Sequence, residues 1–321
     1  MDVRTLEYFV LVAEEGSISA GARRAMVAQP AVSVALRKLE RDVGAPLLER
    51  SHGGIELTVA GHTLFVQAQR VLRCMAEARD ETRRSGARGR AVFTVGLTSG
   101  QASAGELTGP ILQAFRTAHP ELDLRVRELD FAGQFDEVLH RGVDLALVRA
   151  PYEHDDLVME PLFTEPTVLV VSPEHLLAEL PEVSLDALGG ERLLEVVRAP
   201  EAWRAFWSFA GLRTEQAGIP TEELGLIGYC MDVLKHGTVS PMALSGWRLG
   251  GLGAPTIRAV RLTDAPRSVV GVGYRASARQ PEIRSFVDIA RAVTAEMVAL
   301  VPEAAPAMAH SRPVRGYTRS V

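Results

Sequence analysis

Hydrophobic positions near the start of the chain recur every three or four residues, which is the spacing of one face of an α-helix. This pattern predicts amphipathic helices over residues 3–15 and 29–43. Between them a short helix is predicted from Ser19 to Ala25, because the Ser19 hydroxyl can accept a hydrogen bond from a free backbone N–H. Residues 26–28 form a tight turn, and Gly44 ends the last helix. Two short helices joined by a tight turn are typical of a helix-turn-helix.

The helix predicted from Gln29 has a hydrophobic face and a polar face. Pro30 lies in its first turn, where the missing backbone N–H costs nothing. Small polar residues come first along the polar face and cations follow, which suits insertion into a DNA major groove. Glutamine can pair with adenine, and arginine with guanine, through two hydrogen bonds each. We therefore predict that this helix meets DNA through Gln29, Pro30, Ser33, Arg37 and Lys38.

A short β-hairpin is predicted after the third helix. Residues 50–58 contain two short strand patterns around a turn at Gly53–Gly54. Arg50 and His52 of this hairpin are candidates for contacts to DNA phosphates. A solvated surface hairpin without such contacts would give the same pattern.

A long helix is predicted from Val59 to about Arg84, with the Thr58 side chain as its cap. Its hydrophobic positions run down one side: Leu64, Ala68, Val71, Met75 and Ala78. A lone helix of this length needs a partner for such a stripe. The stripe could pack on the helix's own domain. Pairing with the same helix of a second subunit is favoured, because a helix-turn-helix usually binds two half-sites as a dimer.

Beyond a Gly- and Arg-rich linker at residues 85–90, strands and helices alternate. Strands are predicted at 91–97, 122–129, 143–149, within 162–172, at 191–197 and at 269–274. Helices are predicted at 105–118, 134–141, 185–188, 201–210, 228–236 and 281–300. This alternation indicates an α/β unit with a parallel sheet. From Pro302 onward the hydrophobic periodicity ends, which predicts a disordered tail.

The N-terminal segment resembles the winged helix-turn-helix of LysR-type transcriptional regulators. The matching residues lie in the opening helix, the recognition helix, the wing and the turn into the long helix: Leu6, Tyr8, Phe9, Val12, Ala13, Glu15, Gly16, Ser17, Gln29, Pro30, Ala31, Ser33, Leu39, Glu40, Gly44, Leu47, Leu48, Glu49, Arg50, Leu57, Thr58, Ala60 and Gly61. Two residues depart from the family pattern. Gly21 replaces a usual alanine, which weakens its helix by up to roughly 1 kcal/mol. Ala28 replaces a usual serine or threonine, so the recognition helix lacks a side-chain cap worth about 1 kcal/mol.

The remainder resembles the effector-binding domain of the same family, mainly through the segments RGVDLALVR and EPLFTEPTVLVVSPEHLLA. The resemblance implies a multidomain α/β chain whose effector domain has two lobes of periplasmic-binding-protein type, joined by two crossover strands. It implies a winged helix-turn-helix at 1–58, a linker and dimerisation helix at 59–90, lobe I at 91–163 plus 269–301, lobe II at 164–268 and a disordered tail at 302–321.

Ligands of open α/β sheets bind beyond the carboxyl ends of the strands. That rule points to Thr98, Ser99, Gly100, Gln101, Arg149 and Arg198. A helix after Gly100 would offer free N–H groups to an anion, and either arginine could pair with a carboxylate. The resemblance places these residues in the cleft between the lobes and adds Ser240 to its wall. Ser99 as a plain helix cap, and either arginine as a surface residue, remain open alternatives.

Other chemistry is not favoured. Trp203, Trp207 and Trp247 are expected in a core rather than against a ligand. Cys74 and Cys230 are expected as reduced thiols, with redox sensing as the alternative. The segment from Gly96 to Gly100 has threonine where a nucleophile elbow needs serine, and the eight histidines lack metal-ligand spacing. We therefore expect no enzymatic activity, no cofactor and no metal.

Charge is spread unevenly along this chain of net charge −5. Residues 1–90 hold 14 Lys and Arg against 11 Asp and Glu, so DNA binding would depend on a local patch. The opening residues do not resemble a signal peptide and no hydrophobic run could span a bilayer, which favours a bacterial cytoplasmic protein without a membrane partner.

The predicted function is a ligand-responsive DNA-binding regulator that forms a homodimer or homotetramer. Its expected partners are double-stranded operator DNA, a small-molecule effector for which a carboxylate is one candidate, and RNA polymerase as a further candidate. The alternative is a cytoplasmic small-molecule-binding α/β protein whose N-terminal helices serve only dimerisation.

Overall fold

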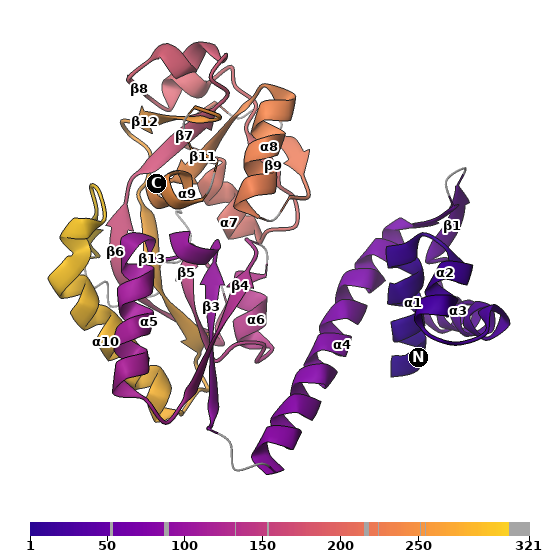
Figure 1. The fold of residues 1–321 in the computed structure, drawn as a ribbon. Helices are drawn as coiled ribbons and strands as arrows, with labels where there is room; N and C mark the ends of the chain where they lie inside the picture. The colour runs from indigo at the N-terminus through magenta and orange to yellow at the C-terminus, as the bar shows by residue number, and fades with distance from the viewer. Residues whose placement is uncertain are drawn as a thin grey trace. The chain divides into compact units, whose positions relative to one another are not determined.

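The computed structural model describes residues 1–51, 54–86, 90–131, 133–152, 154–214, 218–223, 225–250, 252–253 and 255–307. The chain divides into two compact units, Met1–Gly89 and Arg90–Val321 (Figure 1). The first unit is made of helices and one small hairpin, whereas the second is built on β-sheets covered by helices.

The N-terminal unit has the predicted order of three helices, a hairpin and a long helix. Its elements are α1 (Val3–Glu15), α2 (Ile18–Arg24), α3 (Gln29–Val43), β1 (Leu48–Ser51), β2 (Gly54–Leu57) and α4 (Val59–Gly86). Gly44 ends α3 at a φ of +81°, and the Thr58 hydroxyl caps α4 by accepting the N–H of Gly61 at 2.9 Å. The cap of α2 differs from the prediction, since Ser17 rather than Ser19 accepts the N–H of Ala20, at 3.4 Å.

A close contact between α1 and α2 accounts for the glycine at position 21. A Cβ atom there would lie 2.6 Å from Cγ2 of Val12 and 2.9 Å from its Cα. Real Cβ atoms do not approach neighbours so closely, so one of the two helices would have to move. Gly21 therefore offsets its low helix propensity by allowing the two helices to pack against each other.

The hydrophobic stripe of α4 divides into a buried part and an exposed part. Ala68 is buried in the core of its own unit, and Leu64 packs beside it. Val71 and Met75, further along the helix, remain 43% and 42% exposed. Packing within the unit thus accounts for the first half of the stripe, whereas Val71 and Met75 stay available to a second subunit.

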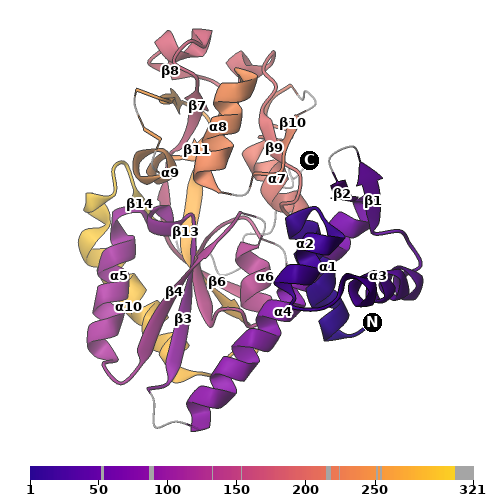
Figure 2. The same cartoon turned by 45° about the vertical axis from the view of Figure 1, so that its right-hand side comes forward.

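Lobe I of the second unit is a mixed sheet with the strand order β14-β6-β13-β5-β3-β4 (Figures 1 and 2). Its strands are β3 (Val92–Thr98), β4 (Asp123–Leu129), β5 (Leu145–Arg149), β6 (Leu157–Glu165), β13 (Ser268–Arg275) and β14 (Ala305–Pro306). Within the described strands of lobe I, the expectation of a parallel sheet is right for β3, β4 and β5. β13 is antiparallel to β5 and β6, because β6 leaves for lobe II and β13 returns from it.

Helices cover both faces of this sheet, as the alternation along β5 requires. Leu145 and Leu147 join a cluster that includes residues of α5 (Thr108–Ala118) and α10 (Pro281–Met297). Ala146 and Val148 join a different cluster, which includes residues of α6 (Gln134–Leu139). Figure 2 shows α5 and α10 on one side of the sheet and α6 on the other. Short 3₁₀ turns flank these helices: η1 (Gly100–Ala102), η2 (Gly105–Leu107) and η5 (Val298–Leu300).

Lobe II has a sheet of order β11-β7-β12-β8 and a separate pair, β9 with β10. Its elements are β7 (Thr167–Val171), η3 (Leu176–Glu179), β8 (Glu182–Val183), η4 (Asp186–Leu188), β9 (Leu194–Val196), α7 (Glu201–Trp207), β10 (Ile219–Thr221), α8 (Leu226–His236), β11 (Val239–Ala243), α9 (Leu244–Leu249) and β12 (Arg258–Leu262). The segment 162–172, predicted to contain one strand, holds the end of β6 and all of β7, with Pro166 between them. The strands β8, β10, β11 and β12 were not predicted.

The end of the described chain corrects the predicted tail. Ala305 and Pro306 form β14 and pair with Thr164 and Phe163 of β6, so residues up to 307 belong to lobe I. The hydrophobic side chain of Val301 anchors this segment, since it is buried in the lobe I core. The remainder of the predicted tail, from residue 308, lies outside the described residues. The sheets also move the lobe boundaries to Glu165 and Ser268, the ends of β6 and β13.

Candidate DNA-reading surface and effector cleft

The polar face of α3 points away from the core of the N-terminal unit. Gln29, Pro30, Arg37 and Lys38 are exposed and Ser33 is half-buried. On the opposite face the hydrophobic residues are buried: Val32, Leu36 and Leu39. Ala28 precedes the helix without a side-chain hydrogen bond, as the sequence predicts. The residues chosen as groove contacts on α3 therefore share one accessible face.

The side chains of the two predicted DNA contacts in the wing, Arg50 and His52, lie outside the described structure. The backbone of Arg50 lies in β1, where it is paired with Ile55 of β2, but its side chain is outside the described structure. His52 lies in the turn outside the described residues. Their proposed contacts to phosphates stay predictions.

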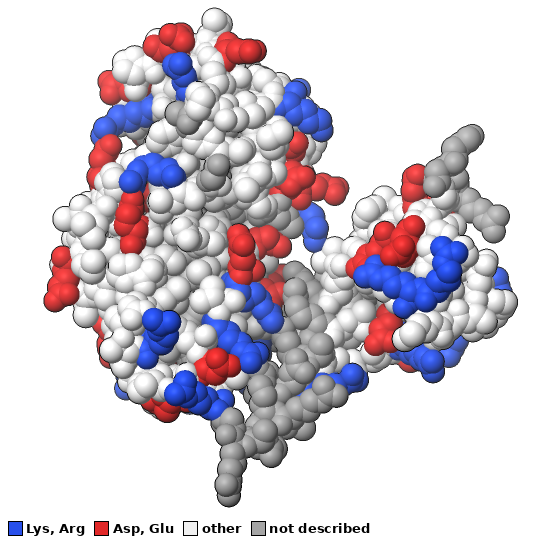
Figure 3. All heavy atoms as spheres, in the orientation of Figure 1, with Lys and Arg blue, Asp and Glu red and all other residues white. Residues whose placement is uncertain are grey.

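Charges of both signs lie side by side on the N-terminal unit (Figure 3). Arg24 contacts Glu14 at 2.7 Å and Glu15 at 3.0 Å, so its charge is largely compensated. Within the described part of the chain, Arg37 forms no such ion pair. Arg37 of α3 thus carries a positive charge available to DNA, in keeping with a local patch rather than a basic domain.

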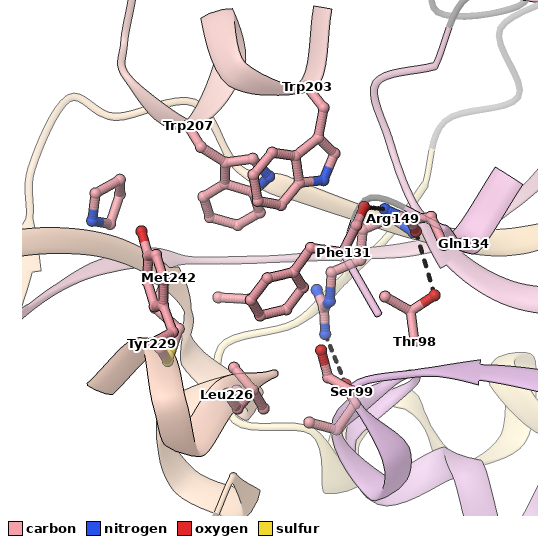
Figure 4. Close-up of a pocket in the computed structure, with 14 residues that line it drawn as sticks. Thr98, Ser99, Phe131, Gln134, Arg149, Trp203, Trp207, Leu226, Tyr229 and Met242 are labelled. Atoms are coloured by element: carbon pink, nitrogen blue, oxygen red, sulfur yellow. Dashed lines mark hydrogen bonds between the residues drawn. The ribbon is translucent and has the colours of Figure 1, made fainter. Parts of the chain in front are cut away.

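A narrow cavity lies between lobe I and lobe II (Figure 4). Its walls come from both lobes: Thr98, Ser99, Ala102, Phe131, Gln134 and Arg149 from lobe I, and Trp203, Trp207, Leu226, Tyr229, Pro241, Met242, Ala243 and Gly246 from lobe II. The empty volume between the walls is about 460 Å³, which includes space open to solvent. Such a cavity suits a small molecule.

Three of the predicted effector residues line this cavity, namely Thr98, Ser99 and Arg149. Gly100 does not line it, and Gln101 and Arg198 have exposed side chains away from its walls. Ser240 is fully buried behind the wall, where its hydroxyl hydrogen bonds to that of Tyr229. Three of the seven predicted residues thus share this cavity, and the binding of an effector there stays a prediction.

The segment after β3 does not form the predicted anion site. An α-helix with a row of free N–H groups was expected after Gly100, but η1 is a single 3₁₀ turn of three residues. The N–H groups of Ala102 and Ser103 donate to the carbonyls of Ser99 and Gly100 within this turn. Ser99 adopts a left-handed conformation, with φ +65°, and its hydroxyl caps nothing. The alternative of Ser99 as a helix cap is thereby wrong.

Arg149 is neither a free cation for a ligand nor a surface residue. Its Nη2 lies 2.7 Å from Oε1 of Glu165, which is completely buried. The guanidinium also donates to the hydroxyls of Ser268 and Ser245 at 2.9 and 2.8 Å and to the carbonyl of Ala102 at 2.8 Å. These partners come from β6, β13, η1 and α9. Arg149 therefore connects the ends of the two crossover strands with elements of both lobes.

Aromatic side chains make up much of the cavity wall. Phe131 of lobe I stacks on Trp203 of lobe II with ring centroids 5.7 Å apart, and its edge meets Tyr229 at 5.8 Å. Trp207 lies 5.5 Å from Trp203 on the same helix, α7. Figure 4 shows both indoles hanging from α7 across the cavity from Thr98 and Ser99. Trp203 and Trp207 belong to the buried core cluster of lobe II, as expected, and in addition they line the cavity, whereas Trp247 packs against the same core.

Sequence reasoning missed Phe131, Gln134 and Tyr229 as cleft residues. Phe131 follows β4 just as Ser99 follows β3, so the strand-end rule could have found it. Trp203 and Trp207 are four residues apart, which places them on one face of a helix, but a core and a cavity wall share that spacing.

The described residues bear on metal binding, membrane spanning and thiol chemistry. In the described ranges, no cluster of three or more His, Cys, Asp or Glu side chains could hold a metal ion. None of the described helices is long and apolar enough to cross a membrane. Cys74 is exposed, whereas burial raises the pKa of the Cys230 thiol to about 11. Burial likewise raises the pKa of the Tyr229 hydroxyl, which keeps it protonated beside Ser240.

Each of the two units matches a known protein family. The family model described as the LysR substrate binding domain matches residues 88–295, and the bacterial regulatory helix-turn-helix model of the lysR family matches residues 3–62. The transcriptional regulator AlsR of Bacillus subtilis is 28% identical over 218 residues, which are 68% of this chain and 71% of AlsR. CfxR of Cupriavidus necator is 32% identical over 194 residues, or 60% of each chain.

A solved structure shows the same fold. The crystal structure of CbnR, a LysR family transcriptional regulator, matches 92% of this chain and 99% of its own with a TM-score of 0.58 at 22% identity. The substrate-domain model alone covers more than half of the chain. The protein therefore belongs to the LysR family of DNA-binding transcriptional regulators, which are not enzymes.

Proposed function

We propose that this regulator reads double-stranded DNA with the polar face of α3 and responds to a small molecule held in the cleft between lobes I and II. The observation that carries the DNA assignment is the accessible face of α3, on which Arg37 lies free of ion pairs in the described structure. The alternative, in which the N-terminal helices serve only dimerisation, is not favoured, because the helix-turn-helix family model matches residues 3–62.

In this proposal Gln29, Ser33 and Arg37 contact base edges in the major groove, whereas the wing contacts phosphates. Bidentate pairing of glutamine with adenine and of arginine with guanine would supply sequence preference. One copy of this surface would bind weakly, because α3 lacks a side-chain cap and its unit carries acidic side chains beside its basic ones. Two copies on two half-sites would supply the missing affinity.

The DNA assignment is tested with duplexes selected from a random pool by the full-length protein. Replacing Arg37 by alanine should weaken binding to the selected sequence by about 1–3 kcal/mol, or roughly 5- to 150-fold in Kd. The matched control is Arg125→Ala, which removes an exposed arginine from lobe I that pairs with Asp123 at 3.0 Å. Unchanged affinity of the Arg37 variant, or an equal loss in the control, would show that α3 does not read the bases.

The cavity suggests how an effector could act on DNA binding. Phe131 from lobe I and Trp203 from lobe II are in direct contact at the cavity wall. A molecule in the cavity would contact both lobes beside this pair, and through these contacts it would favour one angle between the lobes. If the effector binds one lobe angle more tightly than the other, it shifts the population and with it the geometry of DNA contact.

Ser99→Ala tests the cleft assignment. The Ser99 side chain lines the cavity, and its hydroxyl has no hydrogen-bond partner in the described structure. A reporter controlled by the regulator should lose its response to effector in this variant, while the affinity of the protein for DNA stays the same. A normal response would remove Ser99 from the effector site.

We also propose that subunits pair through α4 as a homodimer or as a homotetramer. The exposed Val71 and Met75 support this, because isolated hydrophobic residues at helical spacing are typical of a coiled-coil seam. Sedimentation of a Met75→Glu variant should show a shift toward monomer. Contact with RNA polymerase stays a prediction from the family, and DNA binding supports a location in the bacterial cytoplasm.

A further inference from the structure

Two tryptophans of the cavity wall carry buried indole N–H groups that have no partner in the described structure. The Trp203 and Trp207 side chains are each only 7% exposed, and both line the cavity wall. Their Nε1 atoms are buried and reach no acceptor in the described structure. An indole N–H can only donate, and an unmet buried donor is costly. The pair of tryptophans therefore calls for a hydrogen-bond acceptor inside the cavity.

The polar groups around them are already satisfied within the protein. The Thr98 hydroxyl donates to Oε1 of Gln134 at 3.2 Å, and the Gln134 amide nitrogen donates to the carbonyl of Phe131 at 3.3 Å. The Tyr229 hydroxyl is bonded to that of Ser240. Among the polar side chains of the described wall, Ser99, Trp203 and Trp207 are the ones without any hydrogen bond to the protein, whereas Thr98, Gln134, Arg149 and Tyr229 each form at least one.

The described part of the wall presents no uncompensated positive charge to the cavity. Among the described wall residues Arg149 alone is charged, and Glu165 neutralises it at 2.7 Å. A carboxylate of the ligand would therefore be buried among aromatic rings without a counter-charge, which is strongly unfavourable. Glu128 adds to this, because its carboxylate lies beside Gly100, where a Cβ atom would be 3.3 Å from Oε1. An anion that approaches from that side would meet a negative charge.

We propose that the effector is a small uncharged molecule with a flat, largely apolar ring and a carbonyl or ether oxygen that accepts from Trp203 and Trp207. This proposal rests on the function proposed above, namely that the cleft holds the effector. The rings of Phe131 and Trp203 give the ligand ring an aromatic surface, and the indole N–H groups of Trp203 and Trp207 are donors without an acceptor in the described structure. The carboxylate considered from the sequence is replaced by a neutral acceptor.

Three probes of similar shape separate the possible ligand classes. Acetophenone carries a neutral carbonyl, benzoate carries a carboxylate on the same ring, and ethylbenzene has no acceptor. Calorimetric titration of the full-length protein at pH 7.5 should give a Kd for acetophenone at least about tenfold lower than for the other two. Tighter binding of benzoate than of acetophenone, or no binding of acetophenone, would overturn the proposal.

Variants then locate the acceptor. Trp203→Phe and Trp207→Phe keep an aromatic ring but remove the N–H, so each should raise the Kd for acetophenone by about twofold to tenfold and leave that for ethylbenzene unchanged. Trp247→Phe is the matched control, because the Trp247 N–H already donates to the carbonyl of Ile257 at 3.3 Å and Trp247 does not line the cavity. An equal effect in all three variants would contradict the assignment.

A spectroscopic measurement keeps the test independent of stability. The chain has three tryptophans, so ¹⁵N labelling of indole gives three N–H signals that the same variants assign. Acetophenone should shift the signals of Trp203 and Trp207 and leave that of Trp247 in place. Unmoved signals at saturation would overturn the proposal.

DNA binding, measured by anisotropy in the same samples, separates this proposal from the general function. If acetophenone moves both signals without any effect on DNA binding, the ligand chemistry stands and the sensory role of the cleft fails. If benzoate alone changes DNA binding through the cleft, the sensory role stands and the neutral ligand class is wrong.

Discussion

Replacing Glu165 by glutamine tests whether its buried ion pair with Arg149 secures the crossing between the lobes. Oε1 of Glu165 accepts from Nη2 of Arg149 and from the Ser245 hydroxyl, each at 2.7 Å. Oε2 accepts from the Ser245 N–H at 2.6 Å. A glutamine amide has one acceptor and one donor, so either orientation turns its NH₂ group toward a donor of the protein. The shape of the side chain is kept, but the pair loses both its charge balance and a hydrogen bond.

The cost follows from burial. Glu165 is 0% exposed and the Arg149 side chain 8%, so Arg149 would be left as a nearly buried, uncompensated cation. Removing one partner of such a pair typically costs about 3–5 kcal/mol. We therefore expect the free energy of unfolding of this unit to fall by that amount, which is a large part of the stability of an ordinary domain.

Tryptophan fluorescence during urea titration of the full chain measures this free energy. All three tryptophans lie in the Arg90–Val321 unit, so the signal reports on that unit. The matched control is Glu303→Gln, since Glu303 contacts Arg261 at the same distance of 2.7 Å but both side chains are about half exposed. That pair should contribute at most about 1 kcal/mol. Equal losses in the two variants would refute the claim that burial gives the Glu165 pair its importance.

Three further outcomes are expected. Ala28→Ser should supply the missing cap of α3 and stabilise the N-terminal unit by about 1 kcal/mol in thermal unfolding followed by circular dichroism; a loss of stability would contradict the cap geometry. Gly21→Ala should destabilise the same unit by about 1–3 kcal/mol despite its better helix propensity, because its Cβ would collide with Val12; a gain would show that α1 and α2 can separate freely. With maleimide at pH 8, intact mass should show one label per native chain, on exposed Cys74. Because burial raises the pKa of Cys230 to about 11, its thiol stays protonated at pH 8 and should react as the pH rises toward that value or on unfolding.

The N-terminal unit was predictable because its helices carry strong local signals. The starts of α3 and α4 coincide with Pro30 and Thr58, residues that favour helix N-termini. The one misplaced cap involves two serines two residues apart, Ser17 and Ser19, whose hydroxyls are themselves 3.2 Å apart. Sequence alone has no means to choose between them.

Lobe II was less predictable because its strands are short and paired over long distances. β8 has two residues, and β11 contains Pro241, which is a residue that normally argues against a central strand. β11 tolerates it because it lies at the edge of its sheet, where β7 pairs with one side and a single bridge from Val239 to Leu193 lies on the other. Pairing of this kind is decided by tertiary contacts rather than by local propensity.

The residues that line the cavity could also be predicted only in part. The strand-end rule located Ser99 and Arg149 at the cavity, since it depends only on topology. The rule could not reveal that Glu165, from a strand that arrives later in the chain, neutralises Arg149. Nor could it show that Trp203, a core residue of lobe II, also lines the cavity, because Phe131, which stacks on it there, comes from the other lobe.

Because β6 and β13 pair where the chain leaves and re-enters lobe I, lobe II is one contiguous segment that could be replaced as a unit. Glu165 and Ser268, where the chain leaves lobe I and returns to it, stand opposite each other on one rung of an antiparallel ladder. The whole of lobe II is thus a single insertion whose two ends are joined like the ends of a hairpin. Ligand preference could change in evolution, or by grafting, through replacement of this one contiguous segment. The sheet of lobe I and the helix that reads DNA would keep their own sequences through such an exchange.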